Sequence, residues 1–337
     1  MKNATRIEED SMGEIRVPAT ARYGAQTQRA VNNFTIDSQR MPEPFIKALL
    51  YIKMAAAQAN SKLGYLDAEK ARAIIEAIEN LLSEQFMEHF PVPVLQTGSG
   101  TSTNMNANEV ISFMATTAAV TVSANDHVNM SQSSNDVIPT AIYLSAAVEI
   151  QTRLLPALAD LQMTISEKAE KHAHVLKTGR THLMDALPIR LKDEMNGWAS
   201  QIEDCHARLA QTFERLIKLP LGGTAVGTGV NCPVGFPEAV VKELGTVSGI
   251  NFSVSESFFK GLSSIETPLE ASSNLKACAC VLMKIANDLR WMNSGPLSGL
   301  KEIMLPPLQP GSSIMVDKIN PVIPEAVCMA AAQVTGN

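Results

Sequence analysis

Three stretches of the chain repeat apolar residues at alternating steps of three and four, and this pattern restricts the fold more than any other feature. The stretches cover residues 144–169, 198–219 and 275–289. This spacing gathers apolar side chains on one side of a helix, as in the seam along which long helices pack. We therefore expect three long helices in a bundle, and Pro156 predicts a kink within the first of them.

Length and composition agree with such a bundle. A chain of 337 residues exceeds the size at which single cores stop growing, so we expect two domains or one elongated domain that oligomerises. Aromatic residues make up only 5% of the chain, which favours cores of aliphatic side chains and methionine. We predict an all-α fold with a mostly helical N-terminal domain over residues 1–130 and a central long-helix bundle over residues 131–337.

Shorter elements are predicted outside the bundle. We interpret residues 1–40 as an irregular arm that contains one short strand, and residues 253–266 as a polar loop. Asp67 suits the N-cap of a helix, because its carboxylate can accept hydrogen bonds from the first backbone N–H groups. The further helices expected are 44–63, 67–90, one near 237–247, and a last helix that begins at Pro321.

The charge balance argues against polyanionic partners. The net charge is −6 and no run of Lys or Arg stands out, so we expect neither nucleic acid nor a membrane surface as a partner. The N-terminus contains no apolar core region, and no window approaches 18 uninterrupted apolar residues. We therefore expect a cytoplasmic protein without an export signal.

Neither cysteine nor histidine follows a metal-binding pattern. The five cysteines include no Cys-x-x-Cys pair, and we expect reduced core thiols, because four of them stand in apolar helix patterns. His172 and His174 form the only close histidine pair, and they lack a cysteine or carboxylate at ligand spacing. This arrangement indicates a surface position for both rings.

Four polar segments precede expected helices, at residues 97–104, 131–136, 178–188 and 311–321. Helix N-termini attract anions because unpaired N–H groups and the helix dipole both favour negative charge. Taken singly, each segment is explained by ordinary N-capping, the commoner use of Ser, Thr and Asn. Their joint composition, which includes a histidine and a lysine, favours convergence around a small dianion. The glycine-rich stretch 221–231 follows a helix rather than a strand, so we interpret it as a hinge.

These segments resemble those of class II fumarases, which share a superfamily with aspartate ammonia-lyase and argininosuccinate lyase. Ser134 and the Thr-Gly-Ser-Gly turn favour fumarase, because aspartate ammonia-lyases typically have Thr and Gly-Ala-Gly at these places. The resemblance covers nearly the whole chain. Its motifs are Arg6-Ile-Glu-Glu-Asp-Ser-Met-Gly-Glu14, Gly24-Ala-Gln-Thr-Gln28, Thr97-Gly-Ser-Gly-Thr101, Asn104-Met-Asn-Ala-Asn-Glu-Val110, Ser131-Gln-Ser-Ser-Asn-Asp136, Thr178-Gly-Arg-Thr-His-Leu-Met-Asp-Ala186, Gly222-Gly-Thr-Ala-Val-Gly-Thr-Gly229 and Gly311-Ser-Ser-Ile-Met315.

The resemblance implies a lyase of the tricarboxylic acid cycle that hydrates fumarate reversibly to L-malate, without a metal or organic cofactor. Ser312 matches the base that removes the C3 proton of malate, a role that requires N–H groups or a cation to stabilise the serine anion. His182 matches the residue assigned to proton transfer at the departing hydroxyl, and Glu325 matches the carboxylate that orients it. The residues that match substrate contacts are Ser99, Thr101, Ser133, Ser134, Asn135, Thr181, Lys318 and Asn320.

The resemblance also implies a homotetramer in which each active site collects segments from three subunits. The family continues past Asn337, so over these residues we expect an incomplete bundle without the small C-terminal domain. Val316-Asp317 stands where the family has Pro-Gly, which removes backbone freedom and adds a negative charge beside Lys318. Ser123-Ala-Asn-Asp126 stands where the family has His-Pro-Asn-Asp at a second anion site. Aspartate ammonia-lyase activity and a catalytically impaired helical scaffold therefore stay open as alternatives.

Overall fold

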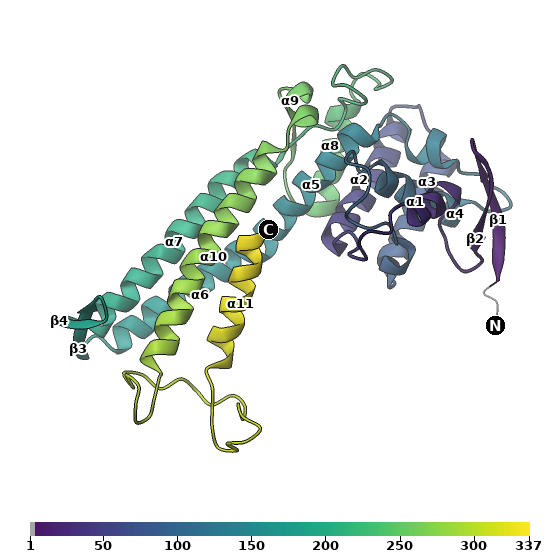
Figure 1. The fold of residues 1–337 in the computed structure, drawn as a ribbon. Coiled ribbons are helices and arrows are strands. Elements are labelled where there is room, and N and C mark those ends of the chain that lie inside the picture. The colour runs from purple at the N-terminus through teal and green to yellow at the C-terminus, as the bar shows by residue number, and fades with distance from the viewer. Residues whose placement is uncertain (1–3) are drawn as a thin grey trace. The chain divides into compact units, whose positions relative to one another are not determined.

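The computed structural model describes residues 4–337, and helices make up most of it (Figure 1). The chain divides into two compact units. The first contains Met1–Glu149 and Glu214–Pro268, and the second contains Ile150–Phe213 and Leu269–Asn337. The predicted all-α class is confirmed, since the strands of the described residues form only three two-stranded sheets. The predicted domain boundary at residue 130 stays a prediction.

The first unit is organised around α2 (Glu43–Lys62), a helix with buried side chains on most of its surface. Ile46, Leu49 and Ile52 of this helix are completely buried. A helix that is apolar nearly all round belongs in the interior of a domain. The helices that pack against α2 are α3 (Ala68–Leu82), α4 (Thr101–Ala115), α5 (Ser134–Glu149) and α8 (Phe236–Ser248).

The predicted N-cap of α3 is confirmed. The Asp67 carboxylate accepts hydrogen bonds from the backbone N–H groups of Glu69 and Lys70, at 2.9 and 3.3 Å. The helix is shorter than the predicted range 67–90, because α3 ends at Leu82 and a separate turn of 3-10 helix, η1 (Phe86–His89), follows.

The prediction of an irregular N-terminal arm is wrong for most of the described residues 4–40. They form an antiparallel hairpin of β1 (Thr5–Asp10) and β2 (Gly13–Pro18), followed by α1 (Ala25–Asn33). The start of α1 is held by Glu109 of α4, whose carboxylate accepts hydrogen bonds from backbone N–H groups of Gly24, Gln26 and Thr27. This cap comes from a residue more than 80 positions away, so no local signal announces the helix.

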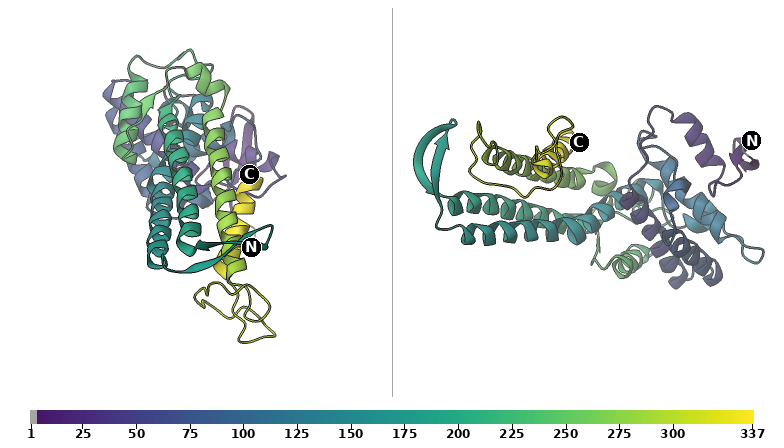
Figure 2. Two further views of the ribbon diagram at one scale, coloured as in Figure 1. Left: turned by 90° about the vertical axis from the view of Figure 1, so that its left-hand side faces the viewer. Right: turned by 90° about the horizontal axis from the view of Figure 1, so that it is seen from below.

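The second unit contains the predicted long helix α6 (Leu155–Lys171) and most of the long helices α7 (Leu191–Leu216) and α10 (Glu266–Met292). These three run side by side in all views of the unit (Figures 1 and 2). Side chains join α7 to α10: Trp198 Nε1 donates to Asp288 Oδ2 at 3.1 Å, and farther along Asn274 Nδ2 donates to Thr212 Oγ1 at 2.8 Å. The last helix is α11 (Val322–Gly336).

Near Pro156, where a kink was predicted, the structure has a wider helical turn that precedes the proline in the chain. The π-helical turn η3 (Ile150–Leu154) immediately precedes α6, and Pro156 stands in the first turn of α6. Proline has no N–H to donate and its ring collides with the carbonyl group four residues earlier, so the backbone before it cannot keep α-helical hydrogen bonding. The apolar pattern therefore predicted the helix, and proline predicted the site of its distortion.

Segment 178–188 was predicted to cap the start of a helix, and this prediction is wrong. The segment lies in a β-hairpin. The strands are β3 (Leu176–Thr181) and β4 (Met184–Arg190), and their register shifts by one residue between Thr178 and Arg180. The connecting residues His182 and Leu183 both have positive φ, 53° and 63°. Asn-Gly is the usual sequence for such a turn, and its absence here left no local signal for a hairpin.

Two smaller predictions also need correction. The polar loop 253–266 contains the short strand β6 (Ser253–Val254), paired with β5 (Lys218–Leu219), and the helical turn α9 (Phe258–Ser263). The cysteines are free thiols as predicted, but Cys280 is exposed and Cys328 is half-buried. Among residues 4–337, none of the helices combines the length and the apolar character that a membrane span requires.

Candidate active site

In the first unit, two predicted anion-binding segments lead into α4 and α5. Gly100 adopts a left-handed backbone with φ 68°, and a β-carbon there would come within 2.9 Å of Ile138. Glycine is therefore required at the point where the chain enters α4. The Ser99 and Thr101 hydroxyls lie 2.9 Å apart at this helix start, and Ser99 is exposed.

The second segment, Ser133 to Asp136, is held by hydrogen bonds at each residue. Ser133 Oγ accepts from the Asn135 backbone N–H at 3.2 Å, and Ser134 Oγ accepts from Asn104 Nδ2 at 2.9 Å. Asn135 Nδ2 donates to the Ala225 carbonyl at 2.7 Å. Ser134 is thus held by α4, Asn135 by the glycine-rich stretch and Ser133 by the segment itself.

A cavity of about 610 Å³ brings two of the predicted contacts together. Ser99 and Asn135 both line it, whereas Thr101, Ser133 and Ser134 do not. Its other walls are mostly apolar and come from α5, the glycine-rich stretch and the segment around α9. The full lining is Gly98, Ser99, Asn135, Ile138, Pro139, Ile142, Ala225, Val226, Phe259, Leu262, Ser263 and Ile265.

Asp136 anchors this side of the site, a role that was not predicted from the sequence. Its buried carboxylate accepts hydrogen bonds from three backbone N–H groups, those of Ser133 at 2.9 Å, Gly222 at 3.0 Å and Thr224 at 2.9 Å. Burial raises the pKa of Asp136, and these three N–H groups oppose that rise. The glycine-rich stretch, predicted as a hinge, is therefore fastened to the start of α5 by one carboxylate.

Lys53 lies in the same polar region and was also missed by sequence reasoning. It is completely buried within α2, and its Nζ donates to Asn129 Oδ1 and Gln132 Oε1, both at 3.0 Å. Burial lowers the pKa of Lys53 to about 7, while attraction to Asp136 acts in the opposite direction. The available signal was a single lysine inside the apolar run 49–57.

In the second unit, the segment 311–321 closes on itself. The Gly311 N–H donates to the Lys318 carbonyl, and Asn320 Nδ2 donates to the Gly311 carbonyl, both at 2.8 Å. Ser312 Oγ accepts from the backbone N–H groups of Met315 at 3.0 Å and Ile314 at 3.4 Å. Such N–H donors are what a serine oxygen needs to carry negative charge.

A cavity of about 760 Å³ joins this segment to the end of α10 and the start of α11. Lys318, Asn320 and Glu325 all line it, and Ser312 lies outside its lining. Asp317 lines the same cavity, so the negative charge noted in the sequence stands beside Lys318 at the site itself. The complete lining is Asn287, Arg290, Trp291, Asn293, Ser294, Gly295, Pro296, Asp317, Lys318, Ile319, Asn320, Pro321 and Glu325.

The remaining predicted residues, Thr181 and His182, lie elsewhere in the second unit. Thr181 lines another cavity of about 560 Å³, formed by the β3–β4 hairpin, α7 and α10. His182 stands exposed in the hairpin turn. Within this unit the structure therefore does not bring His182 to Glu325, nor Thr181 to Lys318.

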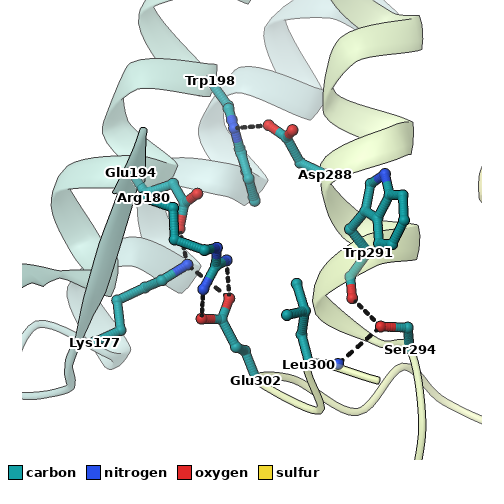
Figure 3. Close-up of polar contacts among 9 residues, drawn as sticks. All are labelled: Lys177, Arg180, Glu194, Trp198, Asp288, Trp291, Ser294, Leu300 and Glu302. Atoms are coloured by element: carbon teal, nitrogen blue, oxygen red, sulfur yellow. Dashed lines mark hydrogen bonds and ion pairs between the residues drawn. The ribbon is translucent and has the colours of Figure 1, made fainter. Parts of the chain in front are cut away.

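An ion-pair cluster, consisting of Lys177, Arg180, Glu194 and Glu302, fastens the hairpin (Figure 3). Lys177 Nζ contacts Glu194 at 2.5 Å and Glu302 at 2.8 Å, and Arg180 binds both oxygens of Glu302, at 2.5 and 2.9 Å. The Arg180 guanidinium and the Lys177 ammonium lower the pKa of Glu302 to about 2. Arg180 thus joins the hairpin to the loop that follows α10.

Within the described residues 4–337, no group of three or more His, Cys, Asp or Glu side chains is arranged to hold a metal ion. The candidate site consists of hydroxyls, amides, a lysine and helix starts, a donor set suited to anionic oxygens.

Comparison with known proteins identifies relatives whose names fit a site for anionic oxygens. A family model described as lyase matches residues 13–336. The chain is 57% identical to fumarate hydratase class II 2 of Pseudomonas aeruginosa, over 99% of this chain and 73% of the relative. It is 53% identical to fumarate hydratase class II of Xylella fastidiosa, over 98% and 70%.

A solved structure gives the same result. The class II fumarase of Schistosoma mansoni superposes with a TM-score of 0.94 at 37% identity, over 99% of this chain and 74% of that one. The fumarate lyase:delta crystallin of Brucella melitensis bound to cobalt superposes with a TM-score of 0.90 at 41% identity, over 99% and 74%. The chain therefore belongs to the lyase family and, within it, to the class II fumarate hydratases, as its motifs predicted.

Proposed function

We propose that this protein catalyses the reversible hydration of fumarate to L-malate. The observation that carries the proposal is the cavity shared by Lys318, Asn320 and Glu325, together with Ser312 of the same segment, whose oxygen accepts hydrogen bonds from two backbone N–H groups. A lysine and an amide can hold a substrate carboxylate, and a supported serine oxygen can act as a base. The family to which the chain belongs supports the same reaction.

In the dehydration direction, Ser312 removes the C3 proton of malate as an alkoxide. The C–H electron pair moves into the adjacent carboxylate, giving an aci-carboxylate that Lys318 and Asn320 stabilise. This electron pair then forms the carbon–carbon double bond as the C2–O bond breaks. The departing hydroxide takes a proton delivered through His182 and leaves as water, and Glu325 orients that histidine.

We further propose that the active sites are composite and form in a homotetramer. Thr181 lines a different cavity from Lys318, and His182 stands in an exposed turn. In the tetramer, Thr181 and His182 of one subunit would therefore lie near Lys318 and Glu325 of another. Exposed apolar side chains of the hairpin support this view, since Leu183 and Leu187 are 76% and 78% exposed. Large exposed apolar side chains that cluster are typical of interaction surfaces. The cytoplasmic location stays a prediction.

The test is direct. Fumarate is added to the purified protein, its ultraviolet absorbance is followed, and the assembly mass is measured by sedimentation under the same conditions. Loss of absorbance with formation of L-malate is expected. A folded tetramer that leaves the absorbance unchanged contradicts the proposal, and ammonia release from L-aspartate would identify aspartate ammonia-lyase activity instead.

The departure at Val316-Asp317 can be tested in the same assay. Val316→Pro with Asp317→Gly restores the family sequence, returns backbone freedom to the segment and removes a negative charge from the Lys318 cavity. We expect the turnover number to increase and the KM for fumarate to fall by about threefold to tenfold, the range for removal of one nearby like charge. If the wild type is inactive, a double variant that also stays inactive would favour the scaffold alternative.

A further inference from the structure

Lys53 occupies a position that is unfavourable for a charged side chain. It stands in the middle of α2 with no exposed surface, among residues that form the core of the first unit. Its two hydrogen-bond acceptors, Asn129 Oδ1 and Gln132 Oε1, are neutral amide oxygens at 3.0 Å. Burying an ammonium group without a direct ion pair is costly, so an apolar residue would stabilise the fold at least as well.

The contacts of Lys53 lead to the segment that contains Ser133 and Ser134. Asn129 Oδ1, which accepts from Lys53, also accepts from Asn104 Nδ2 at 3.2 Å. Asn104 Nδ2 in turn donates to Ser134 Oγ at 2.9 Å. This gives a continuous hydrogen-bonded route from the buried ammonium to a hydroxyl at the start of α5.

A second route reaches the same segment from the other side. Gln132, the second acceptor of Lys53, directly precedes Ser133 in the chain, and its backbone carbonyl accepts from Asn129 Nδ2 at 3.2 Å. Asp136 then fixes the far end of the segment through the Ser133 N–H at 2.9 Å. The positions of Ser133 and Ser134 are thus determined by a network with Lys53 at its centre.

We propose that Lys53 is a positioning residue that holds Ser133 and Ser134 in the arrangement that receives a substrate carboxylate. The inference rests on the proposed hydratase function and extends it to a residue that never touches substrate. A lysine serves this purpose because its three N–H groups can bind several acceptors at once.

The closing experiment replaces Lys53 by methionine, which has a similar length and no charge, and compares this variant with Lys47→Met on the same helix. Lys47 is a matched control because its side chain is 44% exposed and pairs with Glu43 at 3.6 Å. For Lys53→Met we expect the KM for both fumarate and L-malate to rise about tenfold with turnover changed less than about threefold, the signature of lost binding that is equal in the ground state and the transition state. Lys47→Met should leave both constants unchanged.

Thermal unfolding separates this role from a structural one. Removal of the unfavourable buried charge should offset the loss of the hydrogen bonds to Asn129 and Gln132, so Lys53→Met should unfold close to the wild-type temperature, with the same assembly mass. A variant that loses stability and activity together would show that Lys53 supports the fold, and an unchanged KM in a stable variant would equally overturn the proposal.

A double-mutant cycle with Asn104→Leu tests the route. If Lys53 acts through Asn104 and Ser134, the KM of Lys53→Met/Asn104→Leu should be close to that of the more impaired single variant. Multiplication of the two single effects would overturn the route. A wild type that neither turns over nor binds fumarate contradicts the hydratase function, and the inference falls with it; an active wild type with an unaffected Lys53→Met contradicts the inference alone.

Discussion

Two polar clusters stand behind the candidate segments, and they treat charge in opposite ways. In the first unit, Lys53 and Asp136 are buried and bind neutral amides and backbone N–H groups. In the second unit, the ion-pair cluster joins oppositely charged side chains directly, at 2.5 to 2.9 Å. The pKa values reflect this difference. Burial lowers the pKa of Lys53 to about 7, whereas pairing with cations lowers the pKa of Glu302 to about 2.

This difference indicates different purposes for the two clusters. Charges separated by neutral groups in a core cost stability, so their benefit is the orientation of what they bind. Charges paired at a partly exposed surface contribute stability, and the ion-pair cluster uses it to fasten the β3–β4 hairpin to the loop after α10 (Figure 3). Removal of the Lys53 charge should therefore leave stability nearly unchanged, whereas removal of the Glu302 charge should reduce it.

The largest effect is expected at Asp136. Asp136→Asn replaces one carboxylate oxygen by an N–H₂ group, so the Gly222 and Thr224 N–H groups or the Ser133 N–H lose their acceptor inside the core. We expect a loss of about 3 kcal/mol in the free energy of unfolding, typical of orphaned buried donors. Chemical denaturation measures it. Adding Lys53→Met should recover part of the loss, because Lys53 loses its nearby anion; no recovery would contradict the coupling of the two charges.

Glu302→Gln should cause the next largest loss. The variant keeps the shape of the side chain and removes the charge that binds Lys177 and Arg180. Because Glu302 is only partly exposed, we expect a loss of about 2 kcal/mol, between the values for exposed and buried pairs. Denaturant unfolding provides the measurement. A variant as stable as the wild type would remove the contrast between the two clusters.

The pH dependence of stability tests whether the Glu302 charge stabilises the ion-pair cluster. The folded-state pKa of Glu302 is lowered from 4.5 to about 2, so its stabilising contribution is complete above pH 4.5 and is lost as the pH falls from 4.5 to 2. The difference in melting temperature between wild type and Glu302→Gln should therefore be constant at neutral pH and shrink below pH 4.5. A difference that stays constant down to pH 2 would mean that the carboxylate charge is not what stabilises the cluster.

The smallest effect is expected for the ion pair at the end of β4. Asp193 pairs with Arg190 at 2.8 Å, but both side chains are about half exposed, at 46% and 55%. Exposed pairs of this kind contribute little. Asp193→Asn should leave the melting temperature unchanged within error, which makes it the control for Glu302→Gln. A clear loss would mean that exposure does not separate the two pairs.

Much of the fold followed from local patterns. The three-and-four spacing predicted α6, α7 and α10, and Asp67 predicted the start of α3, because helix formation and capping depend on residues within one or two turns. The hairpin β3–β4 and helix α1 were missed for the opposite reason. Glu302 binds Lys177 from 125 positions away and Glu109 caps α1 from 82 to 85 positions away, so neither element carries its own signal.

The features of the candidate site also fall into those that local sequence predicts and those that depend on packing. The sequence by itself determined the helical class, the family and which hydroxyls, amides and basic groups stand near helix starts, since these depend on residue type and short spacing. Only the tertiary structure decided that Ser99 and Asn135 share one cavity, that Lys318, Asn320 and Glu325 share another, and that His182 joins neither. It also gave Lys53 and Asp136 their surroundings, because burial and the pairing of distant charges arise from packing and have no counterpart in the linear sequence.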